Sequence, residues 1–239
     1  MPDNYELELT GSKNENEFVK SFHFRKPSNF KYKAGQFVVL RLIDENLDPK
    51  SSLRQFSLSS SPYEEYLAIT TTIKGRNSKF KESLDSMKRG QELKMFGPNG
   101  NFFLEDEKDC LLIAGDIGIT PFRSIIMQSL FEKRNTRFTL IHYCSSENFR
   151  LFNEELKKVP VDMLRIINVN VDSSAQITLK STDSIDHIKE YIDEKNNEGT
   201  RSAIMIAGPT LFVDSVIGQL RSLNIKNDLK IKKEKFTGY

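Results

Sequence analysis

Two glycines stand between a short apolar run and an amphipathic segment in the middle of the chain, at a spacing that could bind an anion. Leu111 to Ala114 is typical of a buried strand, and after Pro121 the apolar residues recur at helical spacing. Gly115 and Gly118 let the backbone turn sharply and let a ligand approach it closely. The N–H groups at the start of the next helix would then face an anion such as a diphosphate. Because the spacing is Gly-x-x-Gly-x-x-Pro and not G-x-G-x-x-G, an ordinary strand-to-helix connection remains the alternative.

A second stretch, residues 54–62, places a cation, an aromatic ring and a hydroxyl close together. In a strand, Arg54 and Phe56 share one face, whereas Ser57 shares the other face with Gln55. An Arg guanidinium can donate two parallel hydrogen bonds to a diphosphate, a Phe ring can stack on a flat ring system, and a Ser hydroxyl can donate to a ring nitrogen. Taken singly, a solvated Arg and a core Phe are the simpler interpretations.

The first hundred residues or so alternate apolar and polar positions in short runs separated by turn residues. Strands are predicted at residues 5–10, 18–24, 36–43, 52–60, 66–73 and 91–97. One helix is predicted at 78–88, with Ser78 as its N-cap and Gly90 as its stop. Several short strands at this spacing indicate an antiparallel β-barrel or sandwich.

After residue 110, strands alternate with helices. Strands are predicted at 109–115, 137–144, 163–171, 202–208 and 229–236, and helices at 121–133, near 152–158, at 182–194 with Thr182 or Asp183 as cap, and at 210–223. This order predicts a parallel, doubly wound sheet. We therefore expect a two-domain α+β protein, in which an antiparallel β-barrel domain (1–106) precedes an α/β parallel-sheet domain (107–239).

Small residues end three of the predicted parallel strands. Gly115 ends the first, Gly208 and Pro209 end the fourth, and Ser145 and Ser146 follow the strand that ends at Cys144. Ligands of such sheets bind beyond the carboxyl ends of the strands, and these ends share one edge. The pattern therefore favours a crevice for an extended ligand, although glycine also simply ends strands.

The bulk composition is that of an ordinary globular protein. The hydrophobic share is 38%, the charged share is 28%, and the formal net charge of +2 argues against nucleic acid as the main partner. Two cysteines, Cys110 and Cys144, are too few for a zinc site or a disulfide framework, and the three histidines are scattered, so no metal is expected. Because no signal core or membrane-length apolar run is present, we expect a cytoplasmic protein without membrane contact.

Six motifs in order resemble those of the ferredoxin–NADP reductase-like family of flavoproteins. They are Arg54-x-Phe56-Ser57, Gly75-Arg76-Asn77-Ser78 with Phe80, Gly97-Pro98-x-Gly100-x-Phe102 with Leu104, Gly115-x-x-Gly118-x-Thr120-Pro121, Ala207-Gly208-Pro209, and Glu234-x-Phe236. The resemblance extends from about residue 5 to the end of the chain. It implies a β-barrel domain that binds FAD, with FMN less favoured, followed by an α/β domain that binds NADPH or NADH.

The resemblance also implies a role for each motif residue. Arg54 and the backbone near Gly75, Asn77 and Ser78 would hold the flavin diphosphate, Phe56 would stack on the isoalloxazine, and Ser57 would lie near its N5. Gln55, Thr70 and Thr72 complete the expected flavin set. Gly115, Gly118, Thr120 and Pro121 would form the nucleotide loop, and Gly208 and Pro209 would lie near the nicotinamide. Phe236 or Tyr239 would cover the other flavin face, and Glu234 would relay protons or poise an acceptor.

The implied activity is hydride transfer from the nicotinamide to FAD, followed by electron transfer to a separate acceptor such as ferredoxin or flavodoxin. A basic tail comprising Lys226, Lys230, Lys232, Lys233 and Lys235 could receive an acidic carrier, although lysines also protect an edge strand from pairing. The alternatives are a non-catalytic electron-transfer subunit and a nucleotide-sensing module of the same fold.

Several residues depart from the family pattern. Phe56 replaces the usual Tyr, Ala207 stands where many members have Cys, and Asp116 adds a negative charge to the nucleotide loop. Relatives often carry Arg near Ser145 or Ser146, where it serves the 2′-phosphate of NADPH, and Arg150 could substitute for it. The choice between NADPH and NADH stays open at this point.

Overall fold

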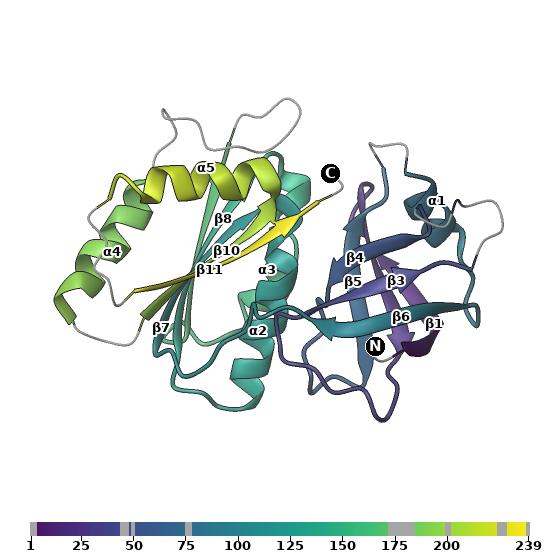
Figure 1. Ribbon diagram of the computed structural model, residues 1–239. Coiled ribbons are helices and arrows are strands. Elements are labelled where there is room, and N and C mark those ends of the chain that lie inside the picture. The colour runs from purple at the N-terminus through teal and green to yellow at the C-terminus, as the bar shows by residue number, and fades with distance from the viewer. Residues whose placement is uncertain are drawn as a thin grey trace. The chain divides into compact units, whose positions relative to one another are not determined.

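The chain folds into two compact units, drawn in Figure 1 from a computed structural model that describes residues 4–43, 48, 51–74, 78–171, 185–198, 202–223 and 229–237. The first unit comprises Met1–Phe103 together with Arg123–Gln128. The second unit comprises Leu104–Phe122 together with Ser129–Tyr239.

Six strands of the first unit form one antiparallel sheet. They are β1 (Asn4–Asn14), β2 (Val19–Arg25), β3 (Phe37–Arg41), β4 (Leu53–Ser57), β5 (Tyr66–Thr72) and β6 (Glu92–Asn99), and their order is β4-β3-β6-β1-β2-β5. An isolated antiparallel bridge between Leu58 and Ile69 joins the two edges of the sheet. The predicted antiparallel barrel is therefore confirmed, and every strand predicted before residue 100 is present.

The barrel core follows from the alternation along these strands. Its fully buried members include Leu7, Leu9, Phe22, Phe24, Val38, Leu40, Leu67, Ile69, Leu93 and Met95. Helix α1 (Lys79–Ser86) adds Phe80 and Leu84 to the same core. The hydroxyl of Ser78 accepts a hydrogen bond from the Lys81 N–H at 3.4 Å, so the predicted N-cap is confirmed.

A buried ion pair organises one part of the first unit. The Arg123 guanidinium donates to both carboxylate oxygens of Glu64, at 3.0 and 3.1 Å, and to the Ser59 carbonyl at 2.7 Å. Burial raises the pKa of Glu64, but the bonds from Arg123, Ser61 and Tyr66 outweigh it and hold this pKa below its usual value. Such a bidentate pair with its remaining lone pairs satisfied fixes geometry as well as charge.

The second unit is built on a five-stranded parallel sheet of the order β11-β10-β7-β8-β9. Its elements are β7 (Asp109–Gly115), β8 (Arg137–Cys144), α3 (Asn153–Leu156), β9 (Leu164–Asn170), α4 (Asp186–Glu198), β10 (Ser202–Pro209), α5 (Thr210–Leu220) and β11 (Lys230–Phe236). Helix α2 (Ile119–Phe131) is divided between the units, because its residues Arg123–Gln128 belong to the first. The predicted doubly wound sheet is confirmed. Thr182 and Asp183, the predicted caps of α4, lie outside the described residues.

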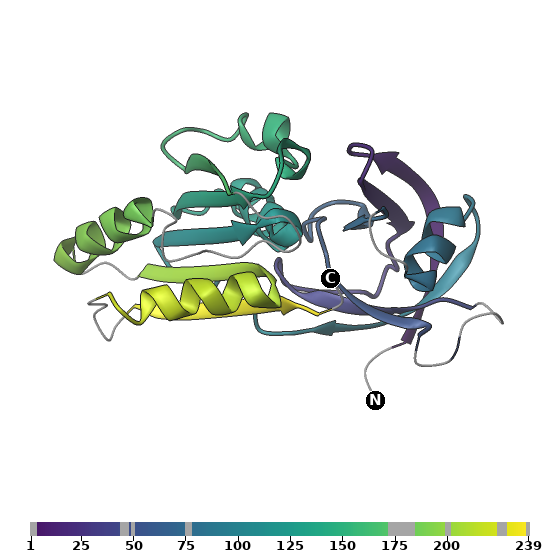
Figure 2. The same ribbon diagram turned by 90° about the horizontal axis from the view of Figure 1, so that it is seen from above.

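Helices α4 and α5 cover the same face of this sheet. Ile188 and Ile192 of α4 and Phe212, Val213 and Val216 of α5 share one buried cluster with the strand residues Leu111, Ile113, Ile141 and Ile204. Figure 2, the view from above, shows α5 lying along β10 and β11. β7 and β10 are buried at every position because the central strands have neighbours on both sides.

The acidic segment before β7 forms ion pairs with the last strand. Lys232 lies 3.1 Å from Glu107, Lys230 lies 2.6 Å from Glu105, and Lys235 lies 2.6 Å from Asp214 of α5. Three lysines of the basic tail are therefore neutralised within their own unit, which favours the structural interpretation of that tail. Lys226 lies outside the described residues.

Within the described ranges, none of the helices combines the length and the apolar character that crossing a bilayer requires. The same ranges contain no cluster of three or more His, Cys, Asp or Glu side chains that could hold a metal ion. Cys110 and Cys144 are both buried and free.

We predict that Lys232→Ala lowers the free energy of unfolding by roughly 2 kcal/mol, because Glu107 would remain buried without its cation. Glu107 is 1% exposed and Lys232 is 16% exposed at the side chain. Lys233→Ala is the matched control, since Lys233 is the adjacent, exposed lysine of the same strand. Urea unfolding would measure both, and equal losses in the two variants would contradict the role of the pair.

The ion pair of Glu107 and Lys232 also makes the stability of the protein depend on pH. Burial raises the pKa of Glu107, but its hydrogen bonds, including those from the Glu105 N–H and Lys232, hold the pKa below its usual value. A carboxyl with a lowered pKa in the folded state contributes stability above its unfolded pKa and loses it as the pH falls through the folded pKa. The difference between wild type and Lys232→Ala should therefore shrink in acid.

Candidate functional site

The glycines of the predicted nucleotide loop lie where the strand order of the parallel sheet reverses. β7 is the first strand of the sheet in sequence; the chain then builds outward through β8 and β9 and returns on the other side of β7 with β10. Gly115 ends β7, and Gly208 lies near the end of the adjacent β10. This reversal is the topological switch point, the place where open α/β sheets bind ligands beyond the carboxyl ends of their strands.

Three glycines allow the backbones to meet there. A Cβ on Gly118 would lie 2.1 Å from the Ala207 carbonyl oxygen, and one on Gly115 would lie 2.5 Å from the Phe212 ring. Gly208 has a φ of +154°, and a Cβ there would lie 3.0 Å from the Phe212 ring and 3.1 Å from the Gly115 carbonyl oxygen. A side chain at Gly118 would collide with the backbone of β10, and one at Gly115 would collide with the Phe212 ring of α5.

The loop continues directly into a helix. Asp116–Gly118 forms one 3₁₀ turn, and α2 begins at Ile119, two residues before the predicted start. Pro121 lies in the first turn of α2, where its missing N–H costs nothing. The Thr120 hydroxyl donates to the Ile117 carbonyl at 3.0 Å, and all of these residues are buried. The result is a helix N-terminus at the switch point, an arrangement suited to anions.

Asp116 ties this loop to the end of β8. Its φ is +46°, a conformation that Asp tolerates better than most residues, and its two carboxylate oxygens accept hydrogen bonds from the N–H and the hydroxyl of Ser145, each at 2.8 Å. Burial raises the pKa of Asp116 to about 6, although the two bonds from Ser145 lower it. The structure thus turns the Asp116 carboxylate toward Ser145, the residue after β8.

His142 makes the second connection between the loop and β8. Its Nε2 lies 2.8 Å from the Asp116 carbonyl oxygen. A carbonyl only accepts, so Nε2 carries the proton and donates. Burial lowers the pKa of His142 to about 4, which leaves the imidazole neutral near pH 7. Sequence reasoning had set this histidine aside as scattered, and only the pairing of β7 with β8 brings it to the loop.

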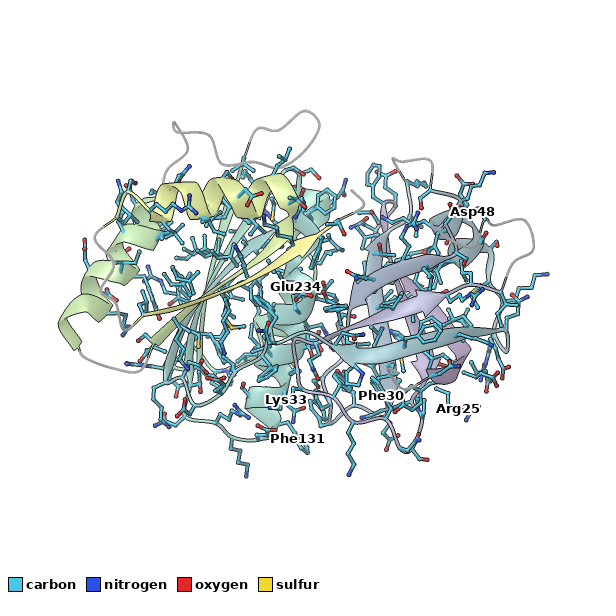
Figure 3. The ribbon with its side chains drawn as sticks, viewed as in Figure 1. Arg25, Phe30, Lys33, Asp48, Phe131 and Glu234 are labelled. Atoms are coloured by element: carbon cyan, nitrogen blue, oxygen red, sulfur yellow. The ribbon has the colours of Figure 1, made fainter. Side chains whose placement is uncertain are left out.

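The end of β11 lies beside the end of β10. Glu234 is opposite Ala207, and Phe236 is opposite Pro209, in the parallel register of the two strands. Figure 3 marks Glu234 on β11, where the residue is partly buried. The Thr210 hydroxyl donates to the Phe236 carbonyl at 3.4 Å. The structure thus brings Gly208, Pro209, Glu234 and Phe236 together, while Tyr239 lies outside the described residues.

In the first unit, Arg54 and Phe56 share a face of β4 as predicted, and both meet α1. The Arg54 guanidinium lies 5.8 Å from the centre of the Phe80 ring, and the Phe56 and Phe80 rings are 5.7 Å apart. Arg54 Nη1 also donates to the Leu53 carbonyl at 2.7 Å. Arg54 and Phe56 are only partly buried, so neither the solvated nor the core interpretation describes them fully.

Lys81 is a second cation at this place that sequence reasoning missed. Its ammonium donates to the Thr72 hydroxyl at 2.7 Å, and its backbone N–H donates to the capping Ser78. A lysine in the first turn after a capped helix start was the available signal, since that position faces any anion held at the start. Gly75 and Asn77 of the same predicted set lie outside the described residues.

The other predicted flavin residues have separate surroundings. Gln55 is exposed, and Ser57 is buried in β4 opposite Phe37. The Thr70 hydroxyl lies 2.7 Å from that of Ser21 and 3.0 Å from that of Ser59. Thr70 therefore belongs to a buried hydroxyl cluster of the barrel wall, while Thr72 is the residue of β5 that meets Lys81.

Comparison with protein families identifies part of the second unit. Residues 112–217 match the model of the oxidoreductase NAD-binding domain. This range contains the glycine loop, the end of β8 and the Ala207-Gly208-Pro209 turn.

Among curated proteins, the chain is similar to flavohemoprotein A of Dictyostelium discoideum, with 24% identity over 87% of this chain and 54% of the relative. It is also similar to the glycine betaine monooxygenase reductase subunit of Pseudomonas aeruginosa, with 33% identity over 58% of this chain and 38% of the relative. The chain thus spans about half the length, or less, of the curated relatives it matches.

Solved structures share the fold over nearly the whole chain. A ferredoxin NADP⁺ reductase from Neisseria gonorrhoeae, with bound FAD and NADP, superimposes with a TM-score of 0.73 at 19% identity, covering 98% of this chain and 99% of the other. The FAD/NAD-binding domain of a nitric oxide dioxygenase from Vibrio cholerae gives a TM-score of 0.72 at 21% identity, covering 97% and 98%.

We predict that Gly118→Ala destabilises the protein by at least about 2 kcal/mol, because the new Cβ would collide with the backbone of Ala207 and not with a movable side chain. The matched control is Gly218→Ala in α5, where a Cβ meets nothing within 4 Å. That control should be neutral or should stabilise by up to about 1 kcal/mol. Urea unfolding of both variants measures the difference, and a Gly118→Ala protein as stable as wild type would contradict the close approach.

Proposed function

We propose that this chain is an FAD-dependent NAD(P)H oxidoreductase of the ferredoxin–NADP reductase-like family. The proposal is supported by the match of residues 112–217 to the oxidoreductase NAD-binding domain and by the fold that the chain shares with a ferredoxin NADP⁺ reductase. Electrons would enter as hydride from the nicotinamide and leave singly or in pairs to a separate acceptor. The reaction needs little acid–base chemistry from the protein, whose task is to bind and orient the two cofactors and to exclude water.

The observation that carries the proposal is the contact of Gly118 with the Ala207 carbonyl at the switch point. It keeps side chains away from the place where a dinucleotide would extend and leaves a helix start facing that place. The oxidoreductase NAD-binding match covers the same residues. Gly115, Gly118, Thr120 and Pro121 would hold the nucleotide diphosphate, and Gly208 and Pro209 would lie beside the nicotinamide.

The residues of the first unit fit a flavin diphosphate. Two cations from different elements, Arg54 and Lys81, gather around Phe80, Thr72 and the capped start of α1. An Arg fork, an ammonium and helix N–H groups are the donors that a diphosphate requires. The partly buried Phe56 ring offers an apolar flat surface beside them. We assign these residues to FAD, with Ser57 as a donor to the ring system.

Once bound, FAD would supply the chemistry of accepting a hydride and releasing its electrons. In the first unit, Arg54 and Lys81 would neutralise the diphosphate and Phe56 would stack on the ring system. In the second unit, Gly208 would leave room for the nicotinamide. We keep Glu234, partly buried on β11, as the group that would hold a proton during electron release.

The acceptor is proposed from chemistry and from the relatives. The chain has only two cysteines, which cannot supply the four thiolates of an ordinary iron–sulfur cluster, so the electrons must leave it. One relative is named as the reductase subunit of a monooxygenase. A small redox protein such as ferredoxin or flavodoxin is the acceptor we propose, and two free, buried cysteines suit the reducing cytoplasm we assign to it.

The decisive measurement is a visible spectrum of the purified protein before and after anaerobic addition of NADH or NADPH. We expect flavin absorbance bands that bleach with at least one of the two nucleotides. A protein that stays colourless after incubation with FAD, or a flavin that neither nucleotide bleaches, would overturn the enzyme proposal and favour the sensor or electron-transfer alternatives.

Arg54→Ala should weaken FAD binding by about tenfold or more, because one charge-assisted contact to the diphosphate is lost. Arg25→Ala is the matched control. Arg25, which is labelled in Figure 3, is an exposed arginine of the same barrel and forms an ion pair with Glu8. Flavin fluorescence during titration measures both affinities. An Arg54→Ala protein that retains FAD as tightly as the Arg25→Ala control would contradict the assignment.

A further inference from the structure

The tie between Asp116 and Ser145 places a carboxylate at the end of the second strand of the parallel sheet. Asp116 itself follows the first strand, β7, but both of its carboxylate oxygens contact Ser145, the residue after β8. Asp116 is 7% exposed, so the surrounding residues confine its side chain. The end of β8 therefore carries a carboxylate that comes from the loop after β7.

That position decides which nucleotide a doubly wound sheet accepts. The diphosphate lies at the loop after the first strand, and the adjoining ribose reaches the end of the second strand. A carboxylate there accepts a hydrogen bond from a free 2′-hydroxyl, whereas a cation there binds a 2′-phosphate. Each carboxylate oxygen has two lone-pair sites, and Ser145 uses one on each, so acceptor capacity remains.

The neighbouring charges do not reverse this preference. His142 donates to the Asp116 carbonyl and is neutral near pH 7, and burial raises the pKa of Cys144 to about 12, so the thiol is neutral too. Arg150 is the nearby cation, but its guanidinium donates to Asn170 at 2.9 Å and pairs with Glu147 at 3.4 Å. Glu147 adds a further exposed negative charge after β8.

We infer that Asp116 selects NADH against NADPH by repelling the 2′-phosphate at the end of β8. The inference rests on the proposed function and extends it by naming the coenzyme and the residue that discriminates. It also accounts for a charged residue in a loop otherwise made of small and apolar residues.

The first test is binding, which does not depend on flavin chemistry. Calorimetric titration should show that ADP-ribose binds wild type about tenfold more tightly than 2′-phospho-ADP-ribose, and that the two bind Asp116→Asn with similar affinity. Asp116→Gly is a second variant that removes the same charge, and glycine adopts a positive φ readily, so the test remains possible if Asp116→Asn does not fold. Asp162→Asn, which removes an exposed charge before β9, should keep the wild-type preference.

The competing explanation is that Arg150 binds the 2′-phosphate. In that case wild type would prefer 2′-phospho-ADP-ribose, and Arg150→Ala would abolish the preference, which would overturn the inference. Equal affinities in wild type, or a ratio unchanged in both Asp116 variants, would overturn it as well. If ADP-ribose is preferred as expected but neither NADH nor NADPH bleaches the flavin, the oxidoreductase proposal fails while the inference about Asp116 stands.

The pH dependence gives a second, independent readout. Burial places the pKa of Asp116 at about 6, so its charge, and with it the discrimination, should grow as the pH rises through that value. A 2′-phosphate also ionises near pH 6, and that contribution is common to wild type and Asp116→Asn. We expect the preference for ADP-ribose to rise more steeply with pH in wild type than in Asp116→Asn, and parallel profiles would contradict the inference.

Discussion

The close approach of two backbones at the switch point is the constraint on which the second unit depends. A Cβ on Gly118 would collide with the Ala207 carbonyl, and a Cβ on Gly115 or Gly208 would meet the side chain of Phe212. Because the loop is held against β10, the start of α2 is directed over the carboxyl ends of the central strands. Close steric contact between the loop and β10 therefore helps to position the place where an anion would bind.

Hydrogen bonds also hold the loop after β7 in place. A loop with buried backbone must satisfy its hydrogen bonds, and Asp116 does this with both its carbonyl and its carboxylate, through His142 and Ser145. Through the contacts with Ser145, the carboxylate of Asp116 lies at the end of β8, although Asp116 itself follows β7. A residue that the family pattern marks as a departure is therefore an integral part of the loop.

In the first unit, hydrogen-bond donors suited to an anion come from a strand and a helix of the barrel. Alternation in β4 sends Arg54 and Phe56 to one face, and α1 supplies Lys81 and its capped first turn. The buried pair of Arg123 and Glu64 holds a further part of the unit in place. Its full bidentate geometry makes it a fixed element, in contrast to the exposed pair of Arg25 and Glu8.

The sequence by itself determined the elements, because hydrophobic period, caps and turn residues are local properties. Every strand of the described residues was predicted, and so were the N-cap at Ser78 and the shared face of Arg54 and Phe56. Only the tertiary structure decided which strand ends meet, since strand order depends on long-range pairing. That pairing placed His142 and Ser145 beside Asp116, Lys81 beside Thr72, and the tail lysines beside acidic partners. Charges distant in sequence act on one another through space, which no local pattern records.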